Sequence, residues 1–158
     1  KQARAFALAD ALGDRNLPVL LKTLDEELWE IRLKVERKSE IGLLYGLISK
    51  VRVMIFLQEM IKAGWLKADG DYNRFKSQLE RVPADALPED KRINPLAMNR
   101  YVLFRALPQA KRYTLAELIR AMDLLLQCNM KLVSSGLDES LVLQQTLTQI
   151  VRKEEVAR

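Results

Sequence analysis

Apolar residues recur every three or four positions along most of the chain, which is the period of amphipathic α-helices. The clearest stripe consists of Leu17, Leu20, Leu21, Leu24, Leu28, Ile31 and Val35. Asn16 before it is a candidate N-cap, and Pro18 suits the first helical turn. The pattern predicts a helix from 17 to about Arg37, preceded by a short helix over 3–12 that Gly13 ends in a left-handed conformation.

The next stripe is wider and covers most sides of a helix. It consists of Ile41, Leu44, Leu47, Ile48, Val51, Met54, Ile55 and Ile61, with Ser39 as candidate N-cap and Gly64 as the end. Because a helix that is apolar on most sides is buried on most sides, we expect a central helix here. Four of its side chains are predicted to be mostly buried, namely Leu44, Ile48, Val51 and Ile55. Gly42 and Gly46 are four residues apart, which favours a close crossing with another helix.

Residues 65–93 change in character. The run 68–71, Ala-Asp-Gly-Asp, indicates a turn. A short helix is predicted over 72–82, and the two prolines of 83–88 indicate a surface loop. Because the apolar pattern is weakest in this part of the chain, we interpret 67–90 as an insertion within one helical domain.

The last third of the chain predicts three more helices. Pro95 suits the start of a helix to about Ala106, which Pro108 breaks or restarts. Thr114 and Glu117 have the spacing of a capping box, in which each side chain accepts a hydrogen bond from a backbone N–H. The stripe that follows consists of Leu115, Leu118, Ile119, Met122, Leu125, Leu126 and Val133.

Ser135-Gly136 is expected to end that helix, and Asp138 is the candidate N-cap of the last one. Its apolar positions are Leu141, Leu143, Leu147, Ile150 and Val151. No run of useful length alternates between apolar and polar residues as a strand does. The chain is therefore predicted to be all-α, a single domain over 1–158 built as a bundle of six or seven helices.

The charge of the chain is unevenly placed. Composition is that of a globular protein, with 49% hydrophobic and 30% charged residues and a net charge of +5. Residues 1–90 hold 15 basic and 15 acidic residues, whereas 91–158 hold 11 basic and 6 acidic residues. The excess can attract nucleic acid or an acidic protein surface, but for an excess this small the solvated surface of a helical domain is the favoured explanation.

Residue types exclude several kinds of chemistry. The chain has no histidine and one cysteine, Cys128, which rules out a histidine-based catalytic site, a zinc site and an internal disulfide. No G-x-x-x-x-G-K-[ST] phosphate-binding loop occurs. We therefore expect no catalytic residue, no cofactor and no metal. Cys128 lies in an apolar stretch and is expected to be a small buried hydrophobic residue.

No membrane segment is expected either. The most apolar run, 41–57, is interrupted by Lys50 and Arg52 and is shorter than the roughly 20 residues that span a bilayer. Without a secretory signal, and with a single cysteine, the chain is predicted to be cytoplasmic.

One basic cluster qualifies as a candidate DNA contact. It consists of Arg100, Arg105, Lys111, Arg112 and Tyr113. Basic side chains bind phosphates and a tyrosine ring stacks on a base. The alternative is ordinary helix-end chemistry, because cations stabilise the C-terminal ends of helices.

Several short motifs, in a fixed order, carry a resemblance to a known family. They are Leu12-Gly13-Asp14-Arg15-Asn16, Lys50-Val51-Arg52, Asn94-Pro95, Ala110-Lys111-Arg112-Tyr113-Thr114, Leu118, Lys131 and Ser134-Ser135-Gly136. In this order and spacing the chain resembles the C-terminal helical domain of the delta subunit of bacterial DNA polymerase III, a component of the clamp loader. The similarity extends over most of the chain and is weakest over 67–90.

The resemblance implies a role in DNA replication as an oligomerisation domain. In that family this domain forms a closed collar with its counterparts from the other clamp-loader subunits, and an N-terminal ATPase-like module binds the sliding clamp. Since the sequence starts at Lys1 without an initiator methionine, we expect a fragment that lacks this module. The subunit belongs to a DNA-directed DNA polymerase, a nucleotidyltransferase assembly, without being its catalytic subunit. DNA is then a partner through the assembly. The alternative function is a basic helical module that binds nucleic acid directly.

Three leucines outside the main stripes are candidate contacts with neighbouring subunits, namely Leu124, Leu132 and Leu141. A collar domain without its neighbours exposes apolar surface that they normally cover. We expect this surface on the last two helices, and a position of Leu141 in the core is the alternative.

Overall fold

The computed structural model describes residues 6–35, 37–134 and 136–153. Its α-helices are α2 (Ala7–Gly13), α3 (Leu17–Arg32), α4 (Glu40–Lys62), α5 (Tyr72–Glu80), α6 (Arg100–Ala110), α7 (Leu115–Ser134) and α8 (Glu139–Val151). Two 3-10 turns, η1 (Ala84–Ala86) and η2 (Pro95–Ala97), complete the elements. None of the described residues forms a strand, so the prediction of an all-α bundle of six or seven helices is confirmed.

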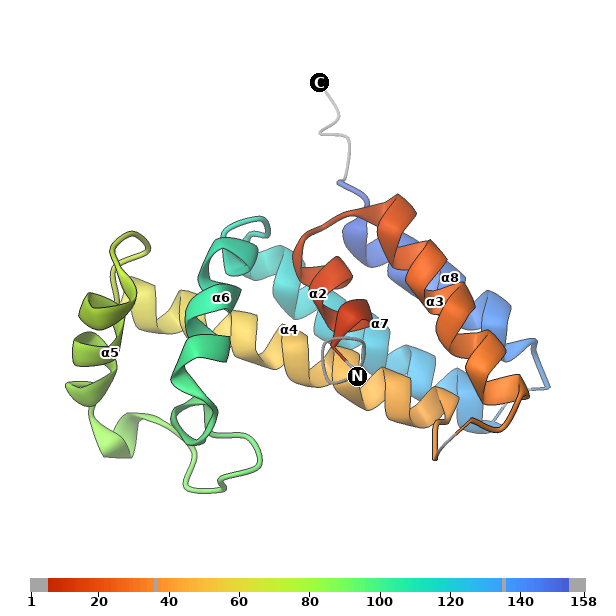
Figure 1. Cartoon of the computed structure of the whole chain (residues 1–158), viewed down its shortest axis with the longest axis horizontal. Helices are drawn as coiled ribbons and strands as arrows, with labels where there is room; N and C mark the ends of the chain where they lie inside the picture. The colour runs from red at the N-terminus through yellow and green to blue at the C-terminus, as the bar shows by residue number, and fades with distance from the viewer. Residues whose placement is uncertain (1–5, 36, 135, 154–158) are drawn as a thin grey trace.

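The long helix α4 extends along the length of the molecule, with other helices packed beside it (Figure 1). It contacts α2, α6 and α7, while α3 and α8 contact each other and close the bundle over α2 and α7. At the C-terminal end of α4, α6 and α5 form a smaller lobe. The central position predicted for this helix is therefore what the structure shows.

The core side of α4 follows its apolar stripe. Leu44, Ile48 and Val51 are buried as predicted, and Ile55 is only partly buried because it lies at the margin of the core cluster. The predicted close crossing at Gly42 and Gly46 is wrong. Both glycines are exposed, and a Cβ atom at Gly46 would meet no atom within 4 Å.

Helix starts are where the sequence pattern predicts them. The side chain of Asn16 accepts a hydrogen bond from the backbone N–H of Val19, and Ser39 accepts one from Gly42. Asp138 caps α8 by accepting from the N–H of Ser140 at 2.9 Å. These side chains satisfy N–H groups that have no partner within the helix.

Gly13 has a different role from the predicted one. It is a buried helical residue, and Arg15 adopts the left-handed conformation instead, with φ 56°. A Cβ atom at Gly13 would lie 2.7 Å from Cδ of Gln109 and 2.8 Å from Cε of Lys50. Gly13 therefore allows α2 to approach α6 and α4 closely. The first residues of the predicted 3–12 helix lie outside the described residues.

Helix α3 is shorter than predicted and ends at Arg32. Lys34 has φ 56°, which stops the helix before Val35, and Val35 is exposed rather than part of the apolar face. The turn toward α4 is held by Lys38, whose ammonium group donates to the carboxylates of Glu27, at 3.1 Å, and Glu30.

The segment before α6 also differs from its prediction. Pro95 begins the short turn η2, and α6 starts only after Asn99, whose side chain accepts from the N–H groups of Tyr101 and Val102. Pro108 does not break α6, which continues through it to Ala110; its missing N–H removes one helical hydrogen bond. The predicted loop over 83–88 contains η1, and Leu87 anchors it in the core.

Candidate functional site

Two of the motifs that carry the family resemblance meet in one buried junction. Arg15, whose side chain is only 6% exposed, donates to both carboxylate oxygens of Glu117, at 3.0 and 2.5 Å. It also donates to the backbone carbonyls of Arg112 at 2.6 Å and Val151 at 2.9 Å. One guanidinium group therefore joins the turn after α2, the start of α7 and the end of α8.

Tyr113 completes this junction from the other motif. Its hydroxyl donates to the carbonyl of Leu12 at 2.6 Å, and the guanidinium carbon of Arg15 lies 4.3 Å from its ring centroid. Burial raises the pKa of the Tyr113 hydroxyl to about 12. The predicted stacking of Tyr113 on a base is wrong, because the ring is enclosed in the protein.

Glu117 serves both the junction and the predicted capping box. Its carboxylate accepts from the N–H of Thr114 at 2.9 Å, and the Thr114 hydroxyl accepts from the N–H of Glu117 at 3.0 Å. The capping box is therefore confirmed. The hydrogen bonds from Arg15 outweigh partial burial and lower the pKa of Glu117 to about 2 from its ordinary 4.5.

This shift predicts a defined loss of stability in acid. The charged Glu117 stabilises the fold fully above pH 4.5, and this contribution is lost as the pH falls through about 2. In a Glu117→Gln variant the side chain has no charge to lose, so its unfolding free energy should vary less over this interval. We expect a difference on the order of 2 kcal/mol, reduced by the exposure of the carboxylate.

Denaturant titrations from pH 5 to pH 2 measure this difference. Glu26→Gln, at an exposed position of α3, is the matched control and should follow the wild-type profile. Parallel profiles of the wild type and Glu117→Gln would show that the junction does not bind Glu117 in its charged form.

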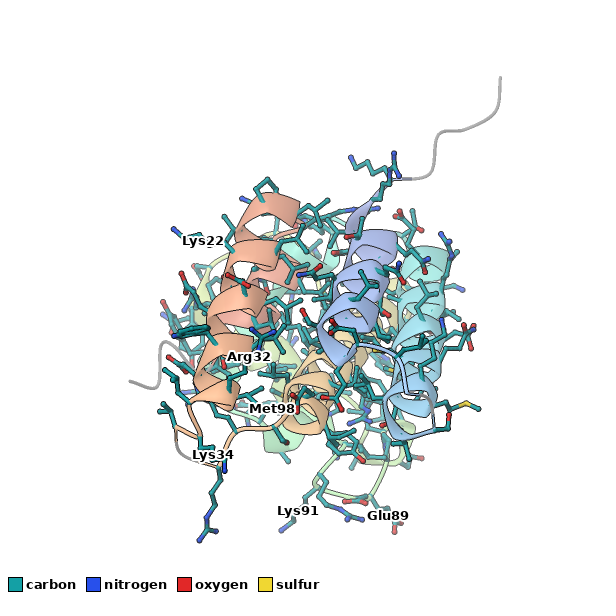
Figure 2. All side chains as sticks on the ribbon, turned by 90° about the vertical axis from the view of Figure 1, so that its right-hand side faces the viewer. Lys22, Arg32, Lys34, Glu89, Lys91 and Met98 are labelled. Atoms are coloured by element: carbon teal, nitrogen blue, oxygen red, sulfur yellow. The ribbon has the colours of Figure 1, made fainter. Side chains whose placement is uncertain are left out.

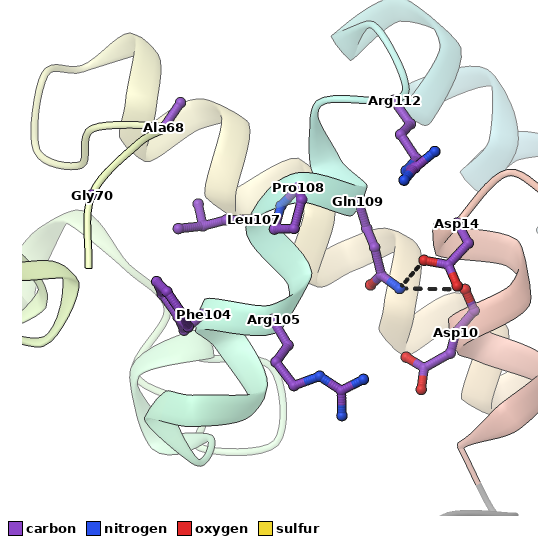
Figure 3. Close-up of a pocket in the computed structure, with 10 residues that line it drawn as sticks. All are labelled: Asp10, Asp14, Ala68, Gly70, Phe104, Arg105, Leu107, Pro108, Gln109 and Arg112. Atoms are coloured by element: carbon purple, nitrogen blue, oxygen red, sulfur yellow. Dashed lines mark hydrogen bonds between the residues drawn. The ribbon is translucent and has the colours of Figure 1, made fainter. Parts of the chain in front are cut away.

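Two of the residues predicted to contact DNA lie along the same groove. Arg105 and Arg112 lie on exposed positions of α6 and just after it, and both line a groove of about 530 Å³. Lys111 is exposed but outside this groove, and Arg100 is partly buried. Figure 3 shows the two guanidinium groups on the α6 side, facing the carboxylates of α2.

The floor and far wall of the groove are polar. The amide of Gln109 donates to the carboxylate of Asp14 at 2.9 Å and to the carbonyl of Asp10 at 3.3 Å (Figure 3). Lys50 donates to the carboxylate of Asp10 at 3.4 Å, and burial lowers the pKa of its ammonium group. The acidic residues of the groove thus have partners within the fold.

Apolar surface is exposed along one face of α7. The α7 stripe consists of Ile119, Leu126, Met130 and Val133, all on one side of the helix and away from its buried residues. The most protruding, Met130 and Val133, are 68% and 73% exposed. The sequence pattern places Ile119, Leu126 and Val133 in the core stripe, and this prediction is wrong. The core side is formed by Leu118, Ala121, Leu125 and Cys128.

The three predicted contact leucines differ in exposure. Leu141 is exposed in the first turn of α8, and so is Leu137 in the turn before it. Leu124 and Leu132 are partly buried against the core. Of the three, Leu141 is therefore the most accessible to a partner.

A second apolar stripe lies on α3 and was not predicted. The α3 stripe consists of Val19 in the first turn and of Trp29 and Leu33 at the C-terminal end, all opposite the buried leucines of this helix, with the exposed Lys22 and Glu26 between them. Seen along the bundle, α3 and α7 form opposite edges with α8 between them (Figure 2). The sequence signal was the position of Trp29, a large apolar residue outside the main stripe of its helix.

Other kinds of site find no support in the part of the chain that the structure describes. It contains no group of three or more acidic, histidine or cysteine side chains able to hold a metal ion. Cys128 is buried, as predicted, and burial raises the pKa of its thiol. None of the described helices is long and apolar enough to cross a membrane.

Comparison with known proteins gives no assignment. No family model, no curated protein and no solved structure matches the chain. The resemblance to the delta-subunit helical domain therefore stays a prediction from the motifs.

Proposed function

We propose that this chain is the collar-forming domain of the delta subunit of a bacterial clamp loader, and that it holds neighbouring subunits together without catalysing a reaction. The observation that carries the proposal is the pair of apolar stripes on α3 and α7, at opposite edges of the bundle. A subunit inside a ring contacts each neighbour with a different surface. Two separate apolar surfaces suit this arrangement, whereas a simple symmetric dimer needs only one.

The motif junction supports the same proposal in a different way. The resemblance rests on residues around Arg15 and Tyr113, and these side chains bind each other although about 100 positions separate them. Two short motifs that each form only a local turn need not contact each other when they lie so far apart in the sequence. The motifs therefore belong to one packing arrangement, which a family of similarly folded domains would share.

The proposal includes a cellular setting. As a clamp-loader component, the chain acts in DNA replication in the cytoplasm, as part of a DNA polymerase III assembly. Its partners are the other clamp-loader subunits, which contact the α3 and α7 stripes with apolar helix faces of their own. Contact with the sliding clamp belongs to another module of the same subunit.

Charged substitutions in the two stripes test the proposal. Met130→Glu on α7 and Trp29→Glu on α3 each place a carboxylate in an apolar contact, where its desolvation is costly. Each variant should lose one neighbour and keep the other, because the two stripes face different subunits. The masses of complexes formed with the other clamp-loader subunits, from size exclusion with light scattering, measure this.

The matched control is Ser77→Glu, which adds the same charge at an exposed position of α5 and should assemble as the wild type does. All three variants should keep the wild-type melting temperature. Normal assembly by both stripe variants would refute the proposal, and normal assembly by one would remove that stripe from the interface.

A further inference from the structure

The exposed side of α6 combines an aromatic ring with two cations. Tyr101, Arg105, Pro108 and Arg112 follow each other at spacings of four, three and four residues, so they share one side of the helix and its end. All four are exposed, and we call this set the α6 ridge. Three of its residues, Arg105, Pro108 and Arg112, line the groove between α6 and α2 (Figure 3), whereas Tyr101 lies outside that lining. It is distinct from both apolar stripes, which lie on α3 and α7.

Tyr101 is fixed in place although its side chain is largely in solvent. The residue is 55% exposed, and its ring meets Tyr72 edge-on, with centroids 5.6 Å apart and an interplanar angle of 77°. Phe104 supports it at 6.4 Å. An exposed ring held by other rings loses little entropy when it stacks on a flat ligand, and unpaired nucleic-acid bases are such ligands.

The two arginines of the ridge are available for anions. Neither Arg105 nor Arg112 takes part in an ion pair among the described residues. They are seven positions apart, which corresponds to about 10 Å along a helix axis. Guanidinium groups bind phosphate oxygens in a two-pronged geometry. The ridge therefore offers two phosphate contacts next to a stacking surface.

The charges that face the ridge across the groove have to be considered too. Asp10 and Asp14 lie on the α2 side, and Lys50 is bound to Asp10. The groove and ridge together hold three cations against two carboxylates. Because both carboxylates lie on the α2 side, phosphates are best placed beside the two guanidinium groups at the α6 side of the groove, away from its floor.

We propose that the α6 ridge binds a short stretch of single-stranded nucleic acid, with Arg105 and Arg112 on two phosphates and Tyr101 stacked on an unpaired base. A single strand is required because a paired base cannot turn its face toward a ring outside the duplex. Nothing in the ridge reads base edges, so binding is independent of sequence. This activity does not depend on the collar function proposed above.

Salt dependence tests the phosphate contacts. With a labelled oligo-dT of about 12 nucleotides in fluorescence anisotropy, two phosphate contacts on a single strand give a slope of about −1.4 in log K against log salt. The wild-type affinity should therefore fall about sevenfold between about 50 and 200 mM salt. Arg105→Gln and Arg112→Gln should each halve the slope, and the double variant should remove it. An unchanged slope in the double variant would overturn the proposal.

The aromatic contact has its own test. Tyr101→Ala should weaken binding of oligo-dT roughly 5- to 150-fold without changing the salt slope, whereas Tyr101→Phe keeps the ring and the affinity. A duplex of the same length should bind more weakly than oligo-dT, and oligo-U should bind about as well. Equal binding of duplex and single strand, or equal loss in Tyr101→Phe and Tyr101→Ala, would overturn the stacking role.

Two further variants separate this site from general electrostatic attraction. Asp14→Asn removes a negative charge across the groove while its side-chain oxygen can still accept from Gln109, so affinity should rise. Lys22→Gln removes a cation from α3, which contacts α2 and α8, and should leave affinity unchanged. A loss in Lys22→Gln as large as in Arg105→Gln would show diffuse binding and refute the assignment to the ridge.

Discussion

Replacing Ile48 with alanine is expected to lower the free energy of unfolding by about 2–5 kcal/mol. The side chain is 6% exposed on the central helix α4, within the cluster that joins the helices of the bundle. Truncation removes apolar contacts and leaves a cavity, because rigid neighbouring helices only partly close around it. Urea denaturation followed by circular dichroism measures the change.

Ile119→Ala is the matched control, since it makes the same chemical change at a residue that is 56% exposed on α7. Its effect on the isolated chain should stay below about 0.5 kcal/mol. Similar losses in the two variants would contradict the arrangement in which α4 is central and this side of α7 is open.

Replacing Arg15 with methionine should cost about 3 kcal/mol. Methionine fills a similar volume but cannot donate, so the carboxylate of Glu117 and the carbonyls of Arg112 and Val151 lose their common donor. The expected cost lies at the low end for a broken buried ion pair, because the Glu117 side chain is 33% exposed and water can solvate it. Denaturant titration at pH 7 measures it.

Two comparisons sharpen this prediction. Arg32→Met, at an exposed position on α3, should change stability by less than about 0.5 kcal/mol. The double variant Arg15→Met with Glu117→Met should be less destabilised than the sum of the two single variants, because no unpaired charge is left. Additive losses would mean that the two side chains do not stabilise each other.

Helix starts were predictable because their chemistry is local. Asn16, Ser39 and Asp138 each accept a hydrogen bond from an N–H group two or three residues ahead. Both partners therefore lie within one short stretch of sequence, where the residue types alone predict the cap. The central position of α4 was predictable for a similar reason, since apolar residues on most sides of one helix require neighbours on most sides.

The residues that end each helix were less predictable, and so was the division of apolar residues between the core side and the solvent side of a helix. The left-handed residues at the first two ends are Arg15 and Lys34, where a sequence argument favours glycine. On α7, apolar residues face both the core and solvent, so their spacing alone assigned Ile119 and Val133 to the wrong side. Which side faces the core depends on where α4 and α8 lie, which is tertiary information.

In the candidate site, too, only part of the residue set could be predicted from the sequence. Basic residues near the end of α6 were identified from sequence, but the aromatic partner was wrong. Tyr113 is buried because Arg15, nearly 100 positions earlier, covers its ring, whereas Tyr101 lies on the exposed side with Arg105. The α3 stripe was missed because Trp29 becomes informative only when the opposite side of its helix is known to be buried.

The Arg15 junction also has a consequence for the order of events during synthesis. Its partners lie 102 and 136 residues farther along the chain, at Glu117 and Val151. While the chain emerges from a ribosome, α2 and α3 are made long before these partners, and the guanidinium group stays hydrated until they arrive. Closing such long loops is the slow, entropically costly part of folding. The junction therefore forms late, and a chain interrupted before residue 151 retains an incompletely bound arginine in the turn after α2.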